Sequence, residues 1–336
     1  MVTDDRGVTH EANQQHQPDI ERAVETLRAG GLVGLPTETV YGLAGDAGNP
    51  DAVRRIFAAK GRPPDHPLIV HLGDASQLTE WAAELPPVAY RLAGAFWPGP
   101  LTLVAQRGPR AIDEVTAGLP TIAVRVPSHP LTLAVLRAFG GGVAAPSANR
   151  FGRVSPTTAQ AVHDELGDAV DLVLDGGPCD VGVESTIVDV TVDPPAILRP
   201  GGIPAEALER VAGGPLASGG ATRAPGTLPA HYAPALRIVL VESVELLEAV
   251  AHHVGAGDRT GVLAPERVAG LPGEVAELAP AGGPATYAQV LYERFREAER
   301  LGLEVLLCVP PSRAGIGTAV RDRLQRAARG SLPAEE

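Results

Sequence analysis

The sequence has few of the features that support redox, metal-cluster or membrane chemistry. Only two of its 336 residues are cysteines, Cys179 and Cys308, which are far apart and lack metal-ligand spacing. It has no run of about 18 apolar residues, so no membrane-spanning helix is expected. Residues 1–18 are polar and lack the apolar core of a secretion signal, so we expect a flexible tail there. These absences predict a cytoplasmic protein with two reduced thiols.

Lysine is almost absent as well. Lys60 is the only lysine among 28 basic residues, so the other 27 are arginine. Either one lysine remains by chance in an arginine-biased composition, or position 60 requires a compact, mobile ammonium in place of a planar guanidinium. The net charge of −12 excludes a general attraction to nucleic acid or anionic membranes, but it allows a local basic cleft.

The hydrophobic pattern of residues 19–210 predicts a mixed α/β domain, with Asp19 as the N-cap of its first helix. Helices are expected at 19–29, 51–60, 131–139 and 157–166, and strands at 32–35, 68–72, 101–105, 121–126, 170–174, 185–191 and 196–198.

Residues 211–234 are rich in Gly, Ala and Pro, which is typical of a linker. The remainder, residues 235–331, predicts a smaller, Rossmann-like parallel α/β domain. It has no Gly-x-Gly-x-x-Gly motif, so no dinucleotide is assigned to it, and it contains no cluster that suggests chemistry. Its strands are expected at 237–241, 261–263 and 304–308, and its helices at 244–254, 287–301 and 318–328.

Polar residues cluster where the predicted strands of the first domain meet loops, the usual location of sites in α/β domains. The clusters are 36–43, 60–71, 144–150 with 155–157, 182–189 and 198–201. Three of them have two interpretations. Hydroxyls in 36–43 hold a small ligand or satisfy a turn. Lys60 and Arg62 clamp an anion or complement the dipole of a helix end. Ser155 binds a ligand or caps the helix at Thr157.

Arg125 lies inside the otherwise apolar run 121–126, and a buried arginine needs an anionic partner from the protein or a ligand. The clusters together supply four cations, Lys60, Arg62, Arg125 and Arg199, with many hydroxyls. There is no Ser-His-Asp order, no Walker-type phosphate loop and no CxxC motif. This composition favours the binding and positioning of anions over covalent catalysis.

At these residues the sequence resembles the YrdC-type threonylcarbamoyl-AMP synthases, in the long form with a C-terminal Sua-type domain. The resemblance is carried by Pro-Thr-Glu-Thr-Val-Tyr-Gly-Leu at 36–43, Trp-Pro-Gly-Pro-Leu-Thr at 97–102, Lys-x-Arg at 60–62, Ser-x-Asn at 147–149, and the runs 182–189 and 198–201. The long form is indicated by Pro-Gly at 225–226, His-Tyr-Ala-Pro at 231–234, Gly-Ile-Gly at 315–317 and Arg-Leu-Gln-Arg-Ala at 323–327.

The resemblance implies a YrdC-like domain with a twisted mixed sheet and an open cationic cleft. It implies that L-threonine, bicarbonate and ATP, carried with Mg²⁺, give threonylcarbamoyl-AMP and pyrophosphate. The product would pass to the threonylcarbamoyl transferase machinery, for threonylcarbamoyladenosine at position 37 of tRNA. A short-lived carbamate calls for a closing lid, which the linker would supply. Residues 227–230, Thr-Leu-Pro-Ala, depart from the basic or larger residues common there in the family.

The resemblance also implies residue roles, with Lys60 and Arg62 catalytic and Arg125 pairing the threonine carboxylate. The residues implied for L-threonine are Thr37, His71, Arg125, Ala145 and Ser185. Those implied for ATP are Lys60, Arg62, Pro64, Thr121, Ser147, Asn149, Ser155, Arg199, His231 and Tyr232.

Three other functions remain open. One is a double-stranded RNA-binding module whose cleft follows a phosphate backbone. Another is a carbamoyl-adenylate-forming enzyme of the same fold, which would not need the hydroxyls of Thr37 and Ser185 for its acceptor. The third is a regulatory protein dominated by its second domain.

Overall fold

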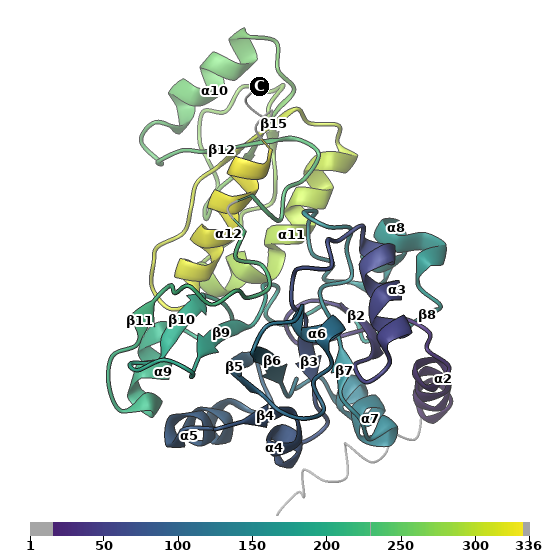
Figure 1. Cartoon of the computed structure of the whole chain (residues 1–336). Helices are drawn as coiled ribbons and strands as arrows, with labels where there is room; N and C mark the ends of the chain where they lie inside the picture. The colour runs from purple at the N-terminus through teal and green to yellow at the C-terminus, as the bar shows by residue number, and fades with distance from the viewer. Residues whose placement is uncertain (1–15, 229, 332–336) are drawn as a thin grey trace, which may run out of the picture.

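A large mixed sheet forms the first part of the molecule (Figure 1). The computed structural model describes residues 16–228 and 230–331. The sheet has 11 strands in the order β11-β10-β9-β5-β6-β3-β7-β2-β1-β8, with β4 beside β5. Their bounds are β1 Val33–Leu35, β2 Gly42–Asp46, β3 Ile69–His71, β4 Ala82–Ala83, β5 Leu101–Arg107, β6 Thr121–Arg125, β7 Val143–Ala144, β8 Leu172–Val173, β9 Thr186–Asp189, β10 Ala196–Arg199 and β11 Ala217–Ser218. The sheet contains parallel pairs such as β3–β6 and antiparallel pairs such as β5–β6, which confirms the mixed sheet.

Helices surround this sheet and contribute to its core (Figure 1). They are α2 Gln17–Arg28, α3 Pro50–Lys60, α4 Leu78–Trp81, α5 Pro87–Phe96, α6 Asp113–Thr116, α7 Pro130–Phe139, α8 Ala159–Leu166 and α9 Ala205–Ala212. The ends of α3 are closely defined. The Asn49 side chain accepts from the backbone N–H of Asp51 and Ala52 at the start, and Gly61 adopts φ 60° after the end. Lys60 is therefore fixed as the last residue of the helix.

The predicted Asp19 cap is wrong, and the Ser155 cap, one of two alternatives for that residue, is not found. Helix α2 begins at Gln17, because Pro18 fits the first turn, and Asp19 lies inside that turn, where its charge complements the helix dipole. Helix α8 is capped by Thr158, whose hydroxyl accepts from the N–H of Ala161, and not by Ser155. The predicted flexible tail over residues 1–18 is wrong at residues 17 and 18, which are helical. Residues 1–15 lie outside the described residues.

The second sheet has four strands, all parallel, in the order β12-β15-β13-β14, which confirms the predicted small parallel sheet. The strands are β12 Arg237–Leu240, β13 Thr260–Leu263, β14 Ala276–Glu277 and β15 Val305–Cys308, and the helices are α10 Leu246–Gly255, α11 Pro284–Arg300 and α12 Gly317–Gly330. No helix in the described ranges is both long and apolar enough to span a bilayer.

The two sheets share a hydrophobic cluster. Val40 and Val183 of the first part, Tyr232 of the linker, and Tyr292 and Leu324 of α11 and α12 belong to one group of buried side chains. In Figure 1 these two helices run from the second sheet toward the first. The C-terminal helices therefore pack directly against the segments that carry the polar clusters.

Candidate active site

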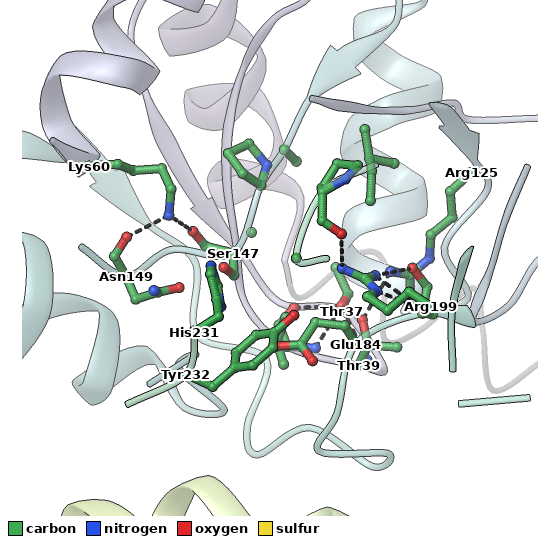
Figure 2. Close-up of a pocket in the computed structure, with 18 of the residues that line it drawn as sticks. Thr37, Thr39, Lys60, Arg125, Ser147, Asn149, Glu184, Arg199, His231 and Tyr232 are labelled. Carbon is green, nitrogen blue, oxygen red and sulfur yellow. Dashed lines mark hydrogen bonds between the residues drawn. The ribbon is translucent and has the colours of Figure 1, made fainter. Parts of the chain in front are cut away.

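One cavity gathers most of the polar clusters. The space between its lining atoms measures about 620 Å³, including its open mouth, but only about 50 Å³ admits the centre of a water molecule. Of the expected site residues, these twelve line it: Thr37, Lys60, Arg62, His71, Arg125, Ala145, Ser147, Asn149, Ser185, Arg199, His231 and Tyr232. Figure 2 shows Lys60 at one end and Arg125 at the other, with Tyr232 between them.

Arg125 forms the first end of the cavity. It is 4% exposed, and its Nη2 lies 2.8 Å from Oε1 of Glu38, the anionic partner that its burial requires. Neither of these two atoms makes a well-directed hydrogen bond. Nη1 donates to Oγ1 of Thr39 at 3.0 Å, and Nε donates to the carbonyl of Gly99 at 3.2 Å. The guanidinium is thus held in place, and Nη2 can still donate hydrogen bonds to an anionic ligand.

His71 stands beside Arg125, because β3 and β6 pair in the register His71 to Arg125. Burial, with a smaller effect of Arg125, lowers the pKa of His71 to about 3. The imidazole is therefore neutral at physiological pH. Its Nδ1 is buried without a hydrogen-bond partner, so it can contact a ligand without adding charge.

The hydroxyls near Arg125 already have protein partners. Thr37 Oγ1 accepts from the N–H groups of Thr39 and Val40 and donates to the carbonyl of Val40 at 2.6 Å, so the turn interpretation is also satisfied. Ser185 Oγ lies 2.8 Å from Thr102 Oγ1 and accepts from Arg199 Nη2 at 3.1 Å. A hydroxyl donates one hydrogen bond and accepts at most two, so Ser185 Oγ can still form one to a ligand, whereas Thr37 Oγ1 already accepts two and donates one.

Lys60 forms the opposite end. Its Nζ donates to the carbonyls of Ser147 and Asn149, each at 2.5 Å (Figure 2). It is 3% exposed, and no carboxylate of the described residues lies within ion-pair distance. Burial lowers the pKa of Lys60 well below its usual value, and the nearby Arg62 adds to this effect. Burial disfavours the charged form of Lys60, and an anionic ligand beside Nζ would stabilise it.

Two more arginines line the cavity. Burial lowers the pKa of Arg62 to about 10; its Nη2 donates to the carbonyl of Pro67 at 2.8 Å, and its buried Nε has no partner. Arg199 donates to the carbonyls of Ser185 and Pro225, so it connects the sheet to the linker. The arrangement offers several cations to a ligand with more than one negative group.

The linker closes the cavity. His231 and Tyr232 lie against each other, with ring centroids 4.1 Å apart, and Tyr232 adopts φ 61°, which is unusual for a non-glycine residue. The hydroxyl of Tyr232 and Nδ1 of His231 are buried without partners. Gly226 packs so closely that a Cβ there would lie 2.3 Å from the Tyr232 hydroxyl. The linker thus fills much of the space that a large ligand would occupy.

Comparisons with known proteins identify the family. A family model described as "Telomere recombination", Sua5/YciO/YrdC, matches residues 25–201. A second model, described as "Threonylcarbamoyl-AMP synthase, C-terminal domain", matches residues 203–329. The chain belongs to the Sua5/YciO/YrdC family.

Relatives and solved structures of this family match nearly the whole chain. The chain is 38% identical to a threonylcarbamoyl-AMP synthase of Pyrococcus abyssi, over 92% of this chain and 93% of the relative. It is 40% identical to one of Bacillus subtilis, over 94% and 95%. The crystal structure of P. abyssi Sua5 complexed with L-threonine superposes with a TM-score of 0.86 at 38% identity, covering 93% of this chain and 94% of that chain. The resemblance inferred from the motifs is confirmed.

Three of the residues expected from the family motifs do not line the cavity. Pro64 is exposed beside Arg62 and lines a separate apolar surface hollow. Thr121 is half-buried at the start of β6. Ser155 is fully buried and donates to Oε1 of Glu184 at 2.7 Å. In this conformation they are not positioned to contact a ligand in the cavity.

Sequence reasoning missed three contributors to this Sua5-family site. Glu184 lies within the motif run 182–189, but no role was assigned to it there. Phe151 lines the cavity and follows the Ser-x-Asn motif by two residues, a spacing that could have been noticed. Arg323 belongs to the C-terminal domain, where no chemical cluster was expected, yet its Nε lies 2.7 Å from Glu184. The motif run at 323–327 includes this arginine but does not indicate that it contacts Glu184.

Proposed function

We propose that the chain makes threonylcarbamoyl-AMP from L-threonine, bicarbonate and ATP, with release of pyrophosphate. The observation that carries this proposal is one buried cavity with Arg125 at one end and Lys60 with Arg62 at the other. An enzyme that joins an amino acid to a nucleotide needs such a pairing of carboxylate and phosphate sites. Its P. abyssi and B. subtilis relatives are threonylcarbamoyl-AMP synthases.

The Arg125 end is the proposed L-threonine site, with Thr37, His71, Ala145 and Ser185. The carboxylate of L-threonine would pair with Nη2 of Arg125, which lacks a directed hydrogen bond in the free site. The P. abyssi structure, which is complexed with L-threonine, supports the choice of L-threonine as the ligand. Glu38 balances the charge of Arg125, so the site suits a zwitterion better than a simple anion.

The Lys60 end is the proposed ATP site, with Arg62, Ser147, Asn149 and Arg199 nearest the phosphates and Pro64, Thr121 and Ser155 at its margins. The threonine amine attacks carbon dioxide derived from bicarbonate, and the resulting carbamate loses a proton. A carbamate oxygen then attacks the α-phosphorus, the bond to the bridging oxygen breaks, and pyrophosphate leaves. Lys60 and Arg62 would stabilise the charge that develops on the phosphates. No residue is assigned as a general base.

Residues 211–234 are the proposed lid between the domains at 19–210 and 235–331. With the linker in place only about 50 Å³ of the cavity admits the centre of a water molecule, so we propose that His231 and Tyr232 move to let the nucleotide in. A known variant of P. abyssi Sua5, whose structure superposes with a TM-score of 0.87 at 36% identity over 93% of each chain, replaces a histidine and a tyrosine by alanine. Residues 231 and 232 form the only His-Tyr pair of this chain.

Magnesium is proposed as a companion of ATP. No group of three or more His, Cys, Asp or Glu side chains in residues 16–228 and 230–331 could hold a metal ion. The only acid on the cavity wall, among the described residues, is Glu184, so phosphate oxygens would be the main ligands of Mg²⁺. When bound, the ion would neutralise charge on the phosphates. The proposed downstream partners are tRNA and the threonylcarbamoyl transferase machinery, in the cytoplasm.

Mass spectrometry of the reaction mixture tests the proposal. The protein is mixed with ATP, Mg²⁺, threonine and ¹³C-bicarbonate, and each substrate is omitted in turn. The expected product has the mass of threonylcarbamoyl-AMP with one labelled carbon, and it requires every substrate. A threonine-independent adenylate would favour the carbamoyl-adenylate reaction instead. Salt-sensitive binding of double-stranded RNA without any adenylate would favour the RNA-binding module.

A further inference from the structure

Glu184 presents a problem for a site that binds polyphosphate. It is the only acidic residue on the described part of the cavity wall, and it shares that wall with Arg199 and Tyr232. A carboxylate that faced the cavity without a partner would repel the phosphates of a nucleotide. The structure therefore has to neutralise Glu184 if the cavity is to bind ATP.

The partners of Glu184 come mainly from the C-terminal domain. Arg323 Nε of α12 donates to Oε2 at 2.7 Å, and the Tyr292 hydroxyl of α11 lies 3.1 Å from both carboxylate oxygens. Among the described residues of the first domain, Ser155 alone bonds to this carboxylate, by donating to Oε1. Burial alone raises the pKa of Glu184, but the charges of Arg323 and Arg199 outweigh it and lower the pKa to about 2. The carboxylate is thus ionised and paired.

Arg323 also reaches the linker. Its guanidinium carbon lies 5.0 Å from the ring centroid of Tyr232, a cation–π geometry. The side chain is 0% exposed and does not line the cavity. Nη1 bonds to Asp322 at 2.5 Å, whereas the buried Nη2 has no partner. One side chain therefore contacts both Glu184 on the wall and Tyr232 on the proposed lid.

We propose that Arg323 is a positioning residue for the nucleotide. It neutralises Glu184, so that the cavity wall accepts the phosphates of ATP although it contains a carboxylate. This inference rests on the proposed function, and it assigns the C-terminal domain a part in nucleotide binding. ATP carries several negative charges whereas threonine is a zwitterion, so an unpaired Glu184 should weaken ATP binding more than threonine binding.

A purely structural role is the main alternative, because buried ion pairs also join domains. The chain offers a matched control in Arg296 of α11, whose Nη1 lies 3.1 Å from Oε1 of Glu165 across the same domain interface. Both side chains of that pair are nearly buried, at 11% and 7% exposure, and neither lines the cavity. Loosening of the interface alone would follow from the loss of either arginine.

The experiment compares Arg323→Met, Glu184→Gln, the double variant Glu184→Gln/Arg323→Met, and Arg296→Met in the full chain. Calorimetry measures the binding of ATP and of threonine separately, and thermal unfolding measures the fold. Binding is read independently of turnover. A wild-type chain that binds ATP but yields no product would refute the proposed function alone.

We expect Arg323→Met to weaken ATP binding by about tenfold or more, with little change for threonine, because a buried carboxylate is left unpaired. The double variant should bind ATP about as well as Glu184→Gln, since the unpaired charge is gone. Arg296→Met should lower the unfolding temperature without weakening ATP binding.

The proposal is overturned if Arg296→Met weakens ATP binding as much as Arg323→Met, or if ATP and threonine are affected equally. It is also overturned if the double variant binds ATP about tenfold less tightly than Glu184→Gln. This last comparison decides the matter if Arg323→Met fails to fold, because neither chain in it carries an unpaired buried carboxylate.

Discussion

Replacing Lys60 by methionine should separate function from stability. Methionine matches much of the length and volume of lysine but carries no charge and donates no hydrogen bond. In the folded chain Nζ bonds only to the carbonyls of Ser147 and Asn149, and no described carboxylate pairs with it. The charge therefore destabilises the folded protein without ligand, and it contributes favourably only when an anionic ligand is bound.

The two effects can be given magnitudes. The variant loses two hydrogen bonds to a charged group, worth about 1.5–3 kcal/mol each, but it also escapes a desolvation penalty of several kcal/mol. These terms oppose each other, so the free energy of unfolding should change by less than about 2 kcal/mol. In the reaction, loss of one charge-assisted contact to phosphate, about 1.5–3 kcal/mol, should lower kcat/KM for ATP about 10- to 150-fold.

Pyrophosphate release at saturating threonine measures the kinetic effect, and thermal unfolding measures stability. Lys60→Arg is the matched control, because it keeps the charge but places a planar guanidinium where Nζ reaches two carbonyls at 2.5 Å. We expect little rescue. Unchanged kinetics in Lys60→Met would remove Lys60 from the mechanism, and full activity of Lys60→Arg would refute the need for a compact ammonium.

Three further predictions concern the lid, a buried histidine and the C-terminal core. Gly226→Ala should weaken ATP binding in calorimetry, because its Cβ would lie 2.8 Å from Nη1 of Arg199 and displace this proposed phosphate contact; unchanged affinity would contradict the role of Arg199. The pKa of His71 is lowered from 6.5 to about 3, so the unfolded chain binds a proton that the folded chain excludes, and stability falls as the pH drops through this window. His71→Asn should flatten that slope by up to about 1.4 kcal/mol per pH unit in urea unfolding, and equal slopes would refute the neutral imidazole. Tyr287→Phe should raise the free energy of unfolding by about 1–3 kcal/mol, because it removes a buried hydroxyl without a partner; a lower unfolding temperature would be the contrary result.

Local chemistry explains which parts of the fold the sequence predicts. Strands such as β5 and β15 are recognisable because their apolar runs are long and bounded by turn residues. Strand β2 was not predicted, since Gly42-Leu43-Ala44-Gly45-Asp46 has two glycines and no β-branched residue. Helix α2 begins earlier than predicted because proline in the first turn was not weighed against the capping residue.

The site was predictable where a single residue type implies a particular partner. Arg125 inside an apolar strand demands an anion, and Glu38 supplies it. The identity of that partner was not predictable, because it lies 87 residues away in a segment that also satisfies a turn. Arg323 is farther still from Glu184 along the chain, at 139 residues, and only packing of the two domains brings them together. Such contacts between distant segments leave no periodic trace in the sequence.

The central claim is that threonine and nucleotide occupy one cavity together. A crystal structure of the chain with L-threonine and a non-hydrolysable ATP analogue tests it most directly. The account predicts the threonine carboxylate on Arg125, the phosphates on Lys60 and Arg62, and a displaced Tyr232. Density for either ligand elsewhere on the molecule, with this cavity still closed by the linker, would contradict it.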